Sequence, residues 1–178
     1  NIRLTARGVV KLMDFGVARP QAEIEDIAGS PHYMAPELMT RGPVTPALDI
    51  YSLGVSFYEA TSRIQFGVCA ERADEHQDLL ERRLDRVNLG HFGAARLEVH
   101  TLIKQMLAFS PQERPTAAEI ISRLKDLERL VGGEDLELWA TRQLPLLLHP
   151  DARVPGMIRP RGVWGGNHRA GTAVGVGP

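Results

Sequence analysis

The chain is most informative at Val10-Lys11-Leu12-Met13-Asp14-Phe15-Gly16. The β-favouring part of this stretch is preceded by a second short run at Ile2 to Leu4, and Gly8 lies between the two. Two such runs around a glycine turn predict a β-hairpin with strands over residues 2–4 and 9–12. The hairpin would carry Asn1 at the start of its first strand and Asp14 just past the end of its second.

These two residues offer a pair of hard oxygen ligands. An amide oxygen from Asn1 and a carboxylate from Asp14, held close together by the hairpin, are donors of the kind that Mg²⁺ prefers. Neither would hold the ion alone, because Mg²⁺ keeps several waters and usually takes its remaining ligands from nucleotide phosphates. The pattern therefore predicts a nucleotide and metal site at this end of the hairpin.

The stretch around Asp14 is one of five motifs that follow one another along the chain. They occupy residues 1–5, 10–19, 29–37, 49–54 and 111–116, and the last three read Gly29-Ser30-Pro31-His32-Tyr33-Met34-Ala35-Pro36-Glu37, Asp49-Ile50-Tyr51-Ser52-Leu53-Gly54 and Pro111-Gln112-Glu113-Arg114-Pro115-Thr116. In this order and at these separations they resemble the eukaryotic-type (Hanks-type) serine/threonine protein kinases, and in wording their bacterial members.

The resemblance implies an α+β, protein-kinase-like fold. The expected architecture is a mostly α-helical C-terminal lobe with a short β-hairpin at its start and no N-terminal lobe, because Asn1 matches the end of the family's catalytic loop. Residues 1–131 would form this partial kinase domain. Residues 132–149 would add a flanking amphipathic helix, and residues 150–178, rich in Gly and Pro, a flexible tail.

Apolar periodicity predicts the helices of this lobe. One long, largely buried helix is expected over Pro46 to Ser62, and others over Glu71 to Leu84 and Arg96 to Leu107. Thr116 followed by Glu119 predicts a capping box at the start of another helix, which Gly132 would end. We expect the apolar stripe of that helix to face inward, with Ile120, Ile121, Leu124, Leu127 and Leu130.

The resemblance also implies roles for particular residues. Asp14 and Asn1 would hold the metal ion as catalytic residues, while Arg3 and Met13 would line the adenine pocket and Ser30 and Tyr33 would dock the protein substrate. Structural roles fall to Phe15, Gly16, Glu37, Asp49 and Arg114. Glu37 and Arg114 would form a buried bidentate pair, and Asp49 would begin the long buried helix.

Simpler interpretations stay open for several of these residues. Asp14 and Ser30 could be ordinary turn residues, and Asn1 a frayed terminus. Arg3 departs from the family pattern, since an aliphatic side chain usually forms the floor of the adenine pocket at this position; its methylene stem could still pack under a base.

The segment between Gly16 and Gly29 has no Ser, Thr or Tyr. Phosphorylation within this segment therefore cannot activate the kinase. It holds Glu23, Glu25 and Asp26 instead. We hypothesise that these carboxylates partly replace the phosphate that elsewhere orders such a loop through arginine pairing. A solvated acidic loop is an equally good interpretation of the same residues.

The reaction implied by the resemblance is transfer of the γ-phosphoryl group from ATP, with Mg²⁺ or Mn²⁺, to a Ser or Thr of a protein substrate. The family's glycine-rich loop, phosphate-binding Lys, its partner Glu and the base Asp are missing from these 178 residues. We therefore expect the chain alone to be inactive. A pseudokinase or a non-catalytic helical interaction module are the alternatives.

Composition adds limits to this interpretation. A net charge of −1 gives no reason to expect nucleic acid as a partner, and 43% hydrophobic residues suffice for one core. Because a lone Cys69 cannot build a disulfide framework, we expect a reduced thiol and a cytoplasmic protein. The sequence has no apolar stretch long enough to span a membrane.

Overall fold

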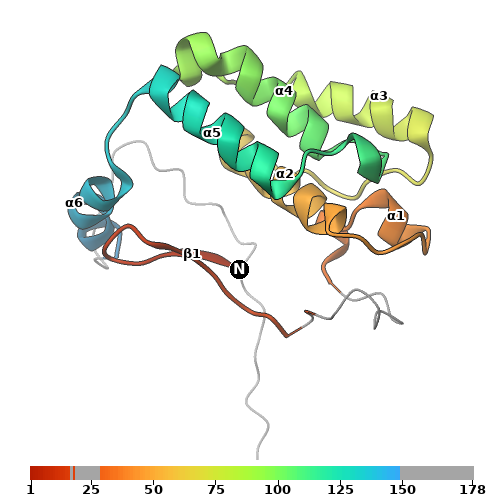
Figure 1. The fold of residues 1–178 in the computed structure, drawn as a ribbon, viewed down its shortest axis with the longest axis horizontal. Helices are drawn as coiled ribbons and strands as arrows, with labels where there is room; N and C mark the ends of the chain where they lie inside the picture. The colour runs from red at the N-terminus through yellow and green to blue at the C-terminus, as the bar shows by residue number, and fades with distance from the viewer. Residues whose placement is uncertain (17, 19–28, 149–178) are drawn as a thin grey trace, which may run out of the picture. The chain divides into compact units, whose positions relative to one another are not determined.

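The computed structural model describes residues 1–16, 18 and 29–148. Within them it contains a two-stranded sheet and a series of helices (Figure 1). The elements are β1 (Ile2–Leu4), β2 (Val10–Leu12), η2 (Pro31–Tyr33), α1 (Pro36–Met39), α2 (Ala47–Ser62), α3 (Ala73–Leu84), η3 (Gly90–Ala95), α4 (Arg96–Met106), η4 (Pro111–Glu113), α5 (Ala117–Val131) and α6 (Leu136–Leu148). The expected mostly helical architecture with a short hairpin at its start is confirmed.

The hairpin closes through a turn that the sequence specifies locally. Gly8 has φ of 74°, a left-handed conformation that glycine adopts without the steric cost of a Cβ. The Gly8 N–H donates to the Thr5 carbonyl at 3.0 Å, and the Val9 N–H donates to Thr5 Oγ1 at 3.0 Å. These hydrogen bonds close the turn.

The chain divides into two compact units. The first contains Asn1–Arg3 and Lys11–Asp135, and therefore holds all the predicted site residues. The second contains Leu4–Val10 and, in the described part of the chain, α6. Within this second unit the hairpin turn lies against α6, since a Cβ on Gly8 would come 2.4 Å from Glu137 Cα.

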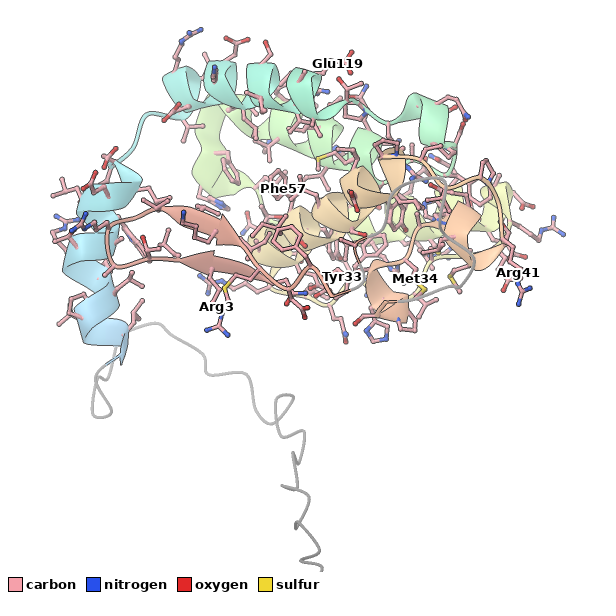
Figure 2. All side chains as sticks on the ribbon, turned by 60° about the horizontal axis from the view of Figure 1, so that its bottom comes forward. Arg3, Tyr33, Met34, Arg41, Phe57 and Glu119 are labelled. Carbon is pink, nitrogen blue, oxygen red and sulfur yellow. The ribbon has the colours of Figure 1, made fainter. Side chains whose placement is uncertain are left out.

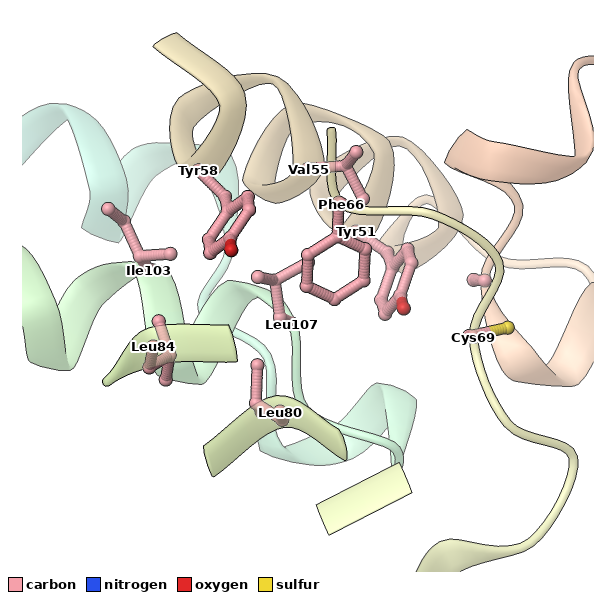
Figure 3. Packing of buried hydrophobic residues seen from close by; sticks show 10 residues of the cluster. Tyr51, Val55, Tyr58, Phe66, Cys69, Leu80, Leu84, Ile103 and Leu107 are labelled. Carbon is pink, nitrogen blue, oxygen red and sulfur yellow. The ribbon is translucent and has the colours of Figure 1, made fainter. Parts of the chain in front are cut away.

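The core of the first unit is built around α2. Tyr51, Val55 and Tyr58 on this helix are buried, and Phe66 packs between the two tyrosine rings at centroid distances of 6.3 and 5.1 Å (Figure 3). Across from them α4 packs against α2, and Gly54 makes the approach close, because a Cβ there would lie 2.9 Å from Met106 Cβ. This core supports the segment that precedes α2.

The start and end of α5 follow its local sequence. Thr116 is the N-cap: its Oγ1 accepts from the Glu119 N–H at 3.3 Å, and the Glu119 carboxylate accepts from the Thr116 N–H at 2.7 Å. Gly132 caps the other end with φ of 63°. The predicted capping box and C-terminal glycine are confirmed.

The predicted inward stripe of α5 is wrong for three of its five residues. Ile120 and Leu127 are buried, whereas Ile121, Leu124 and Leu130 are 55%, 37% and 65% exposed. The reason is that the main neighbours of α5, which are η3 and α4, cover only one side of its wide apolar face. An apolar groove of about 350 Å³ runs beside it, with Leu124 and Leu127 among its lining residues.

On α4, Leu97 is 74% exposed at the first turn. The other apolar residues of that helix are buried or half-buried. Among the helices over the described residues, none is long and apolar enough to cross a bilayer.

Candidate functional site

The hairpin brings the two predicted metal ligands to the same end. The Met13 N–H donates to the Asn1 carbonyl at 2.8 Å, so the residue before Asp14 is paired with Asn1 across the two strands. Asp14 has φ of 61°, in the left-handed region that Asp tolerates better than most residues. Its Oδ1 accepts from the Gly16 N–H at 3.3 Å. This is the contact of a turn aspartate, and within residues 1–16, 18 and 29–148 the second carboxylate oxygen has no hydrogen bond.

The side chains of Asn1 and Asp14 are exposed, as are those of the nearby residues Arg3, Met13 and Phe15. The described residues contain no cluster of three or more His, Cys, Asp or Glu that would hold a metal ion by itself. A carboxylate and an amide oxygen nevertheless suit Mg²⁺, which commonly takes one or two protein ligands and completes its shell with water and nucleotide phosphates. The donor set fits a nucleotide-bound ion rather than a resident structural metal.

The segment Ser30 to Tyr33 is anchored on α2 by a small network. Ser52 Oγ donates to the Tyr33 carbonyl at 2.8 Å, and the Tyr33 hydroxyl donates to Glu59 Oε2 at 2.7 Å. The other oxygen of Glu59 accepts from the Phe66 N–H at 3.0 Å. Glu59 therefore ties this segment to the connection that follows α2. Figure 2 shows Tyr33 and Met34 following one another along the segment.

The hydrogen bond to Glu59, with burial and the carboxylate charge as smaller causes, raises the pKa of Tyr33 to about 12. Tyr33 is thus a neutral donor at any physiological pH. Ser30 lies at the start of η2, is exposed, and makes no capping hydrogen bond through its hydroxyl.

Arg114 and Glu37 form a buried bidentate pair. Nη1 donates to Glu37 Oε1 at 2.6 Å and Nη2 donates to Oε2 at 2.7 Å, with side chains 0% and 9% exposed. The remaining guanidinium N–H groups donate to the carbonyls of Ala108, Ala47 and Phe109 at 2.9 to 3.0 Å. The predicted docking segment, residues 29–37, ends in α1, and the pair fixes this end to the chain between α4 and α5.

Comparison with known proteins agrees with this geometry. The protein kinase domain family matches residues 1–124. The chain belongs to the protein kinase domain family. Similar proteins include human serine/threonine-protein kinase Nek5 (32% identity over 69% of this chain and 18% of that kinase), rabbit serine/threonine-protein kinase 17A (30% over 68% and 32%) and Mycobacterium tuberculosis serine/threonine-protein kinase PknK (33% over 74% and 12%).

The chain spans between about an eighth and a third of the length of these relatives. All three are named as serine/threonine-protein kinases, and they include a bacterial enzyme. Their names agree with the resemblance that the wording of the motifs indicated.

In the kinase domain Asp49 lies in the first turn of α2, where the N-cap residue is Pro46. The aspartate is exposed. A carboxylate in the first turn is favourable for the helix dipole. Its predicted role in ordering a catalytic loop stays a prediction.

Sequence reasoning missed Glu59 and His76. Glu59 lies near the end of a largely apolar helix, and a carboxylate in such a pattern was a signal that it has polar partners. His76, on α3, is buried, although the surrounding charges suggested a surface helix. Glu23, Glu25 and Asp26, and the predicted tail over residues 150–178, lie outside the described residues.

Proposed function

We propose that this kinase domain serves in transfer of the γ-phosphoryl group of ATP to a serine or threonine hydroxyl of a protein substrate. The observation that carries the proposal is the backbone pairing of Asn1 with Met13, which brings Asn1 and Asp14 to the same end of the hairpin. The names of the kinases that the chain resembles support the serine/threonine acceptor. The reduced Cys69 and the lack of a spanning helix in the described part agree with a cytoplasmic location.

In this reaction the hydroxyl oxygen forms a bond to the γ-phosphorus while the bond to the β,γ-bridging oxygen breaks. A bound Mg²⁺ or Mn²⁺ supplies neutralisation of the charge on the phosphate oxygens. Asp14 and Asn1 would hold it, and Arg3 and Met13 would flank the adenine. The hydroxyl proton goes to a carboxylate base that these 178 residues do not include, so we propose that the chain alone does not transfer phosphate.

In this proposal, Ser30 and Tyr33 dock the protein substrate. Tyr33 is bonded to Glu59 through its hydroxyl and to Ser52 through its carbonyl, so the backbone beside Ser30 is held against α2. Since phosphoryl transfer depends mainly on positioning and electrostatics, a rigid docking segment is a useful property for the acceptor side.

Two experiments test the proposal. The first joins residues 1–178 to the part of PknK that precedes the matching Asn, and measures ³²P transfer from ATP to a serine/threonine peptide library. We expect transfer by this chimaera, none by the 178-residue chain, and a loss of about a hundredfold or more in Asp14→Asn. Transfer at full rate by the Asp14→Asn chimaera would contradict the role of Asp14.

The second experiment does not need a competent enzyme. Mn²⁺ with ATP is added to the ¹⁵N-labelled chain, and paramagnetic broadening of backbone signals is recorded. Broadening centred on residues 13 and 14, and lost in Asn1→Ala/Asp14→Ala, is expected. Equal broadening in the double variant would mean that the metal binds elsewhere, while Glu119→Gln serves as the matched control on an exposed carboxylate.

A further inference from the structure

His76 is a titratable side chain in the core of the kinase domain. It lies on α3 with 1% of its surface exposed, and its ring packs between Tyr51 and Phe109 at centroid distances of 6.0 and 5.6 Å. None of the five motifs includes it, and neither the proposed metal site nor the docking segment uses it. A buried imidazole at this place therefore calls for its own explanation.

The hydrogen bonding of the ring defines its protonation. Nε2 lies 2.8 Å from the Leu107 carbonyl, which only accepts, so Nε2 carries the proton and donates. Nδ1 is fully buried and has no hydrogen-bond partner in the described part of the chain. Neutral His76 leaves only a lone pair unsatisfied, whereas protonated His76 would bury a second N–H and a positive charge without an acceptor.

The charged groups around His76 do little to favour its cation. Arg83 on the same helix and Arg114 from the chain after η4 oppose protonation, while Glu37 on α1 favours it. Glu37 is already paired with Arg114. From α2 and from the connection before α3, this core also contains Tyr51, Tyr58 and Cys69. The pKa values of Tyr51 and Cys69 are both raised chiefly by burial, so these two side chains are neutral. Burial, the largest cause, lowers the pKa of His76 below its ordinary value of 6.5, although the hydrogen bond to the Leu107 carbonyl acts in the opposite direction.

The backbone that receives the His76 hydrogen bond also holds Arg114. Leu107 is followed directly by Ala108 and Phe109, and the carbonyls of both accept from the Arg114 guanidinium. The Phe109 ring is one of the two that flank the imidazole. A displacement of this short stretch would thus move two of the acceptors that orient Arg114 toward Glu37.

We propose that His76 is an acid-sensitive latch: its protonation loosens α3 from residues 107–109 and thereby weakens the Arg114–Glu37 pair that anchors the docking segment. The direction follows from linkage. Because the folded state binds the proton less readily than the unfolded chain, the stabilisation is complete above about pH 6.5 and is lost as the pH falls below that value. As the pH falls, protonation of this single group can lower the folding equilibrium constant by at most about tenfold per pH unit.

The first test is a pH titration of the six histidine ring signals of the ¹³C-labelled chain by NMR. Exposed histidines titrate near 6.5 in peptides, and we expect the His76 signal to stay in its neutral position well below that pH. Titration of folded His76 at or above 6.5 would overturn the proposal. The measurement uses the unmodified chain, so it does not depend on any variant folding.

The second test compares the thermal unfolding midpoint from about pH 7.5 to about pH 5. The variants are His76→Phe, which keeps a ring, and His76→Gln, which keeps a donor for Leu107; His91→Gln is the exposed control. We expect the wild type and the control to lose several degrees more than the His76 variants. Equal losses in all four proteins would overturn the proposal.

The third test reads the coupling to Arg114. Its Nε–H is protected by the bond to the Ala108 carbonyl, so its hydrogen exchange reports on the pair. At about pH 5 we expect exchange to be severalfold faster in the wild type than in His76→Phe measured at the same pH. Equal rates would mean that the protonation is not relayed to Arg114. None of these readouts depends on phosphoryl transfer, so the latch and the proposed kinase activity fail or succeed separately.

Discussion

Arg114 uses all five of its guanidinium N–H donors. Two go to Glu37 and three to backbone carbonyls, and the guanidinium also lies 4.9 Å from the centre of the Tyr51 ring. Lysine has three donors in a different geometry and cannot reproduce the planar, bidentate contact. The identity of this residue is therefore restricted by hydrogen bonding and by charge together.

Removing the partner of this arginine should be costly. Glu37→Ala leaves a buried guanidinium charge unpaired, and we expect the free energy of unfolding to fall by about 3–5 kcal/mol. Urea denaturation followed by circular dichroism measures the change. The matched control is Arg129→Ala, which breaks the Arg129–Asp126 pair, where both side chains are largely exposed. A similar loss in the control would show that the burial of the Glu37 pair has no special effect.

Tyr33 should make stability fall at high pH. Its pKa is raised to about 12 by the bond to Glu59, whereas an unfolded tyrosine ionises near 10. The unfolded chain therefore loses the proton first, and the contribution of this tyrosine declines as the pH rises from about 10 to about 12. Denaturation midpoints of wild type and Tyr33→Phe over this range test the idea. The wild type should show the steeper decline, and parallel curves would contradict it.

At the level of the helices, the close contact between α2 and α4 depends on Gly54, which has no Cβ. Gly54→Ala would bring a Cβ to 2.9 Å from Met106 Cβ, a backbone-proximal atom that cannot swing away. We expect destabilisation of about 1–3 kcal/mol from overpacking. The control is Gly90→Ala, since its new Cβ meets only the end of the flexible Asn88 side chain. An equal shift of the urea unfolding midpoint in both variants would contradict the prediction.

Element boundaries were largely predictable because their signals are local. Pro46, the Thr116–Glu119 box and Gly132 each mark a helix end through their own backbone chemistry. The burial of individual side chains, in contrast, does not follow from the local sequence alone. Ile121 and Leu130 repeat with the right period, yet whether they are covered depends on which elements pack beside α5.

The candidate site shows the same division. The hairpin alone predicts that Asn1 and Asp14 lie near one another, whereas Glu37 and Arg114 are 77 residues apart and were paired only through the family resemblance. The contacts of Glu59 and His76 arise from how α2, α3 and the connections around them pack. No period or motif in the sequence specifies such tertiary partners.

At the scale of the whole molecule, exposed apolar side chains should govern solubility. Leu97 and Leu130 are each about two-thirds or more exposed, and large apolar patches on a soluble chain favour association. We expect Leu97→Glu/Leu130→Glu to reduce concentration-dependent light scattering while changing the thermal midpoint little, because neither side chain is packed. Leu102→Glu, in the core, should unfold the chain. Unchanged scattering in the surface variant would mean that association uses another surface.

The Glu37–Arg114 pair also has a consequence for the order of biosynthesis. A ribosome completes the glutamate 77 residues before the arginine that anchors it. Until then the segment around Tyr33 lacks one of its main attachments, and a nascent chain stalled short of residue 114 should be nicked there by a protease. A chain stalled well past residue 114 should resist this cleavage. The docking segment would therefore become fully anchored only after a residue far downstream has been synthesised.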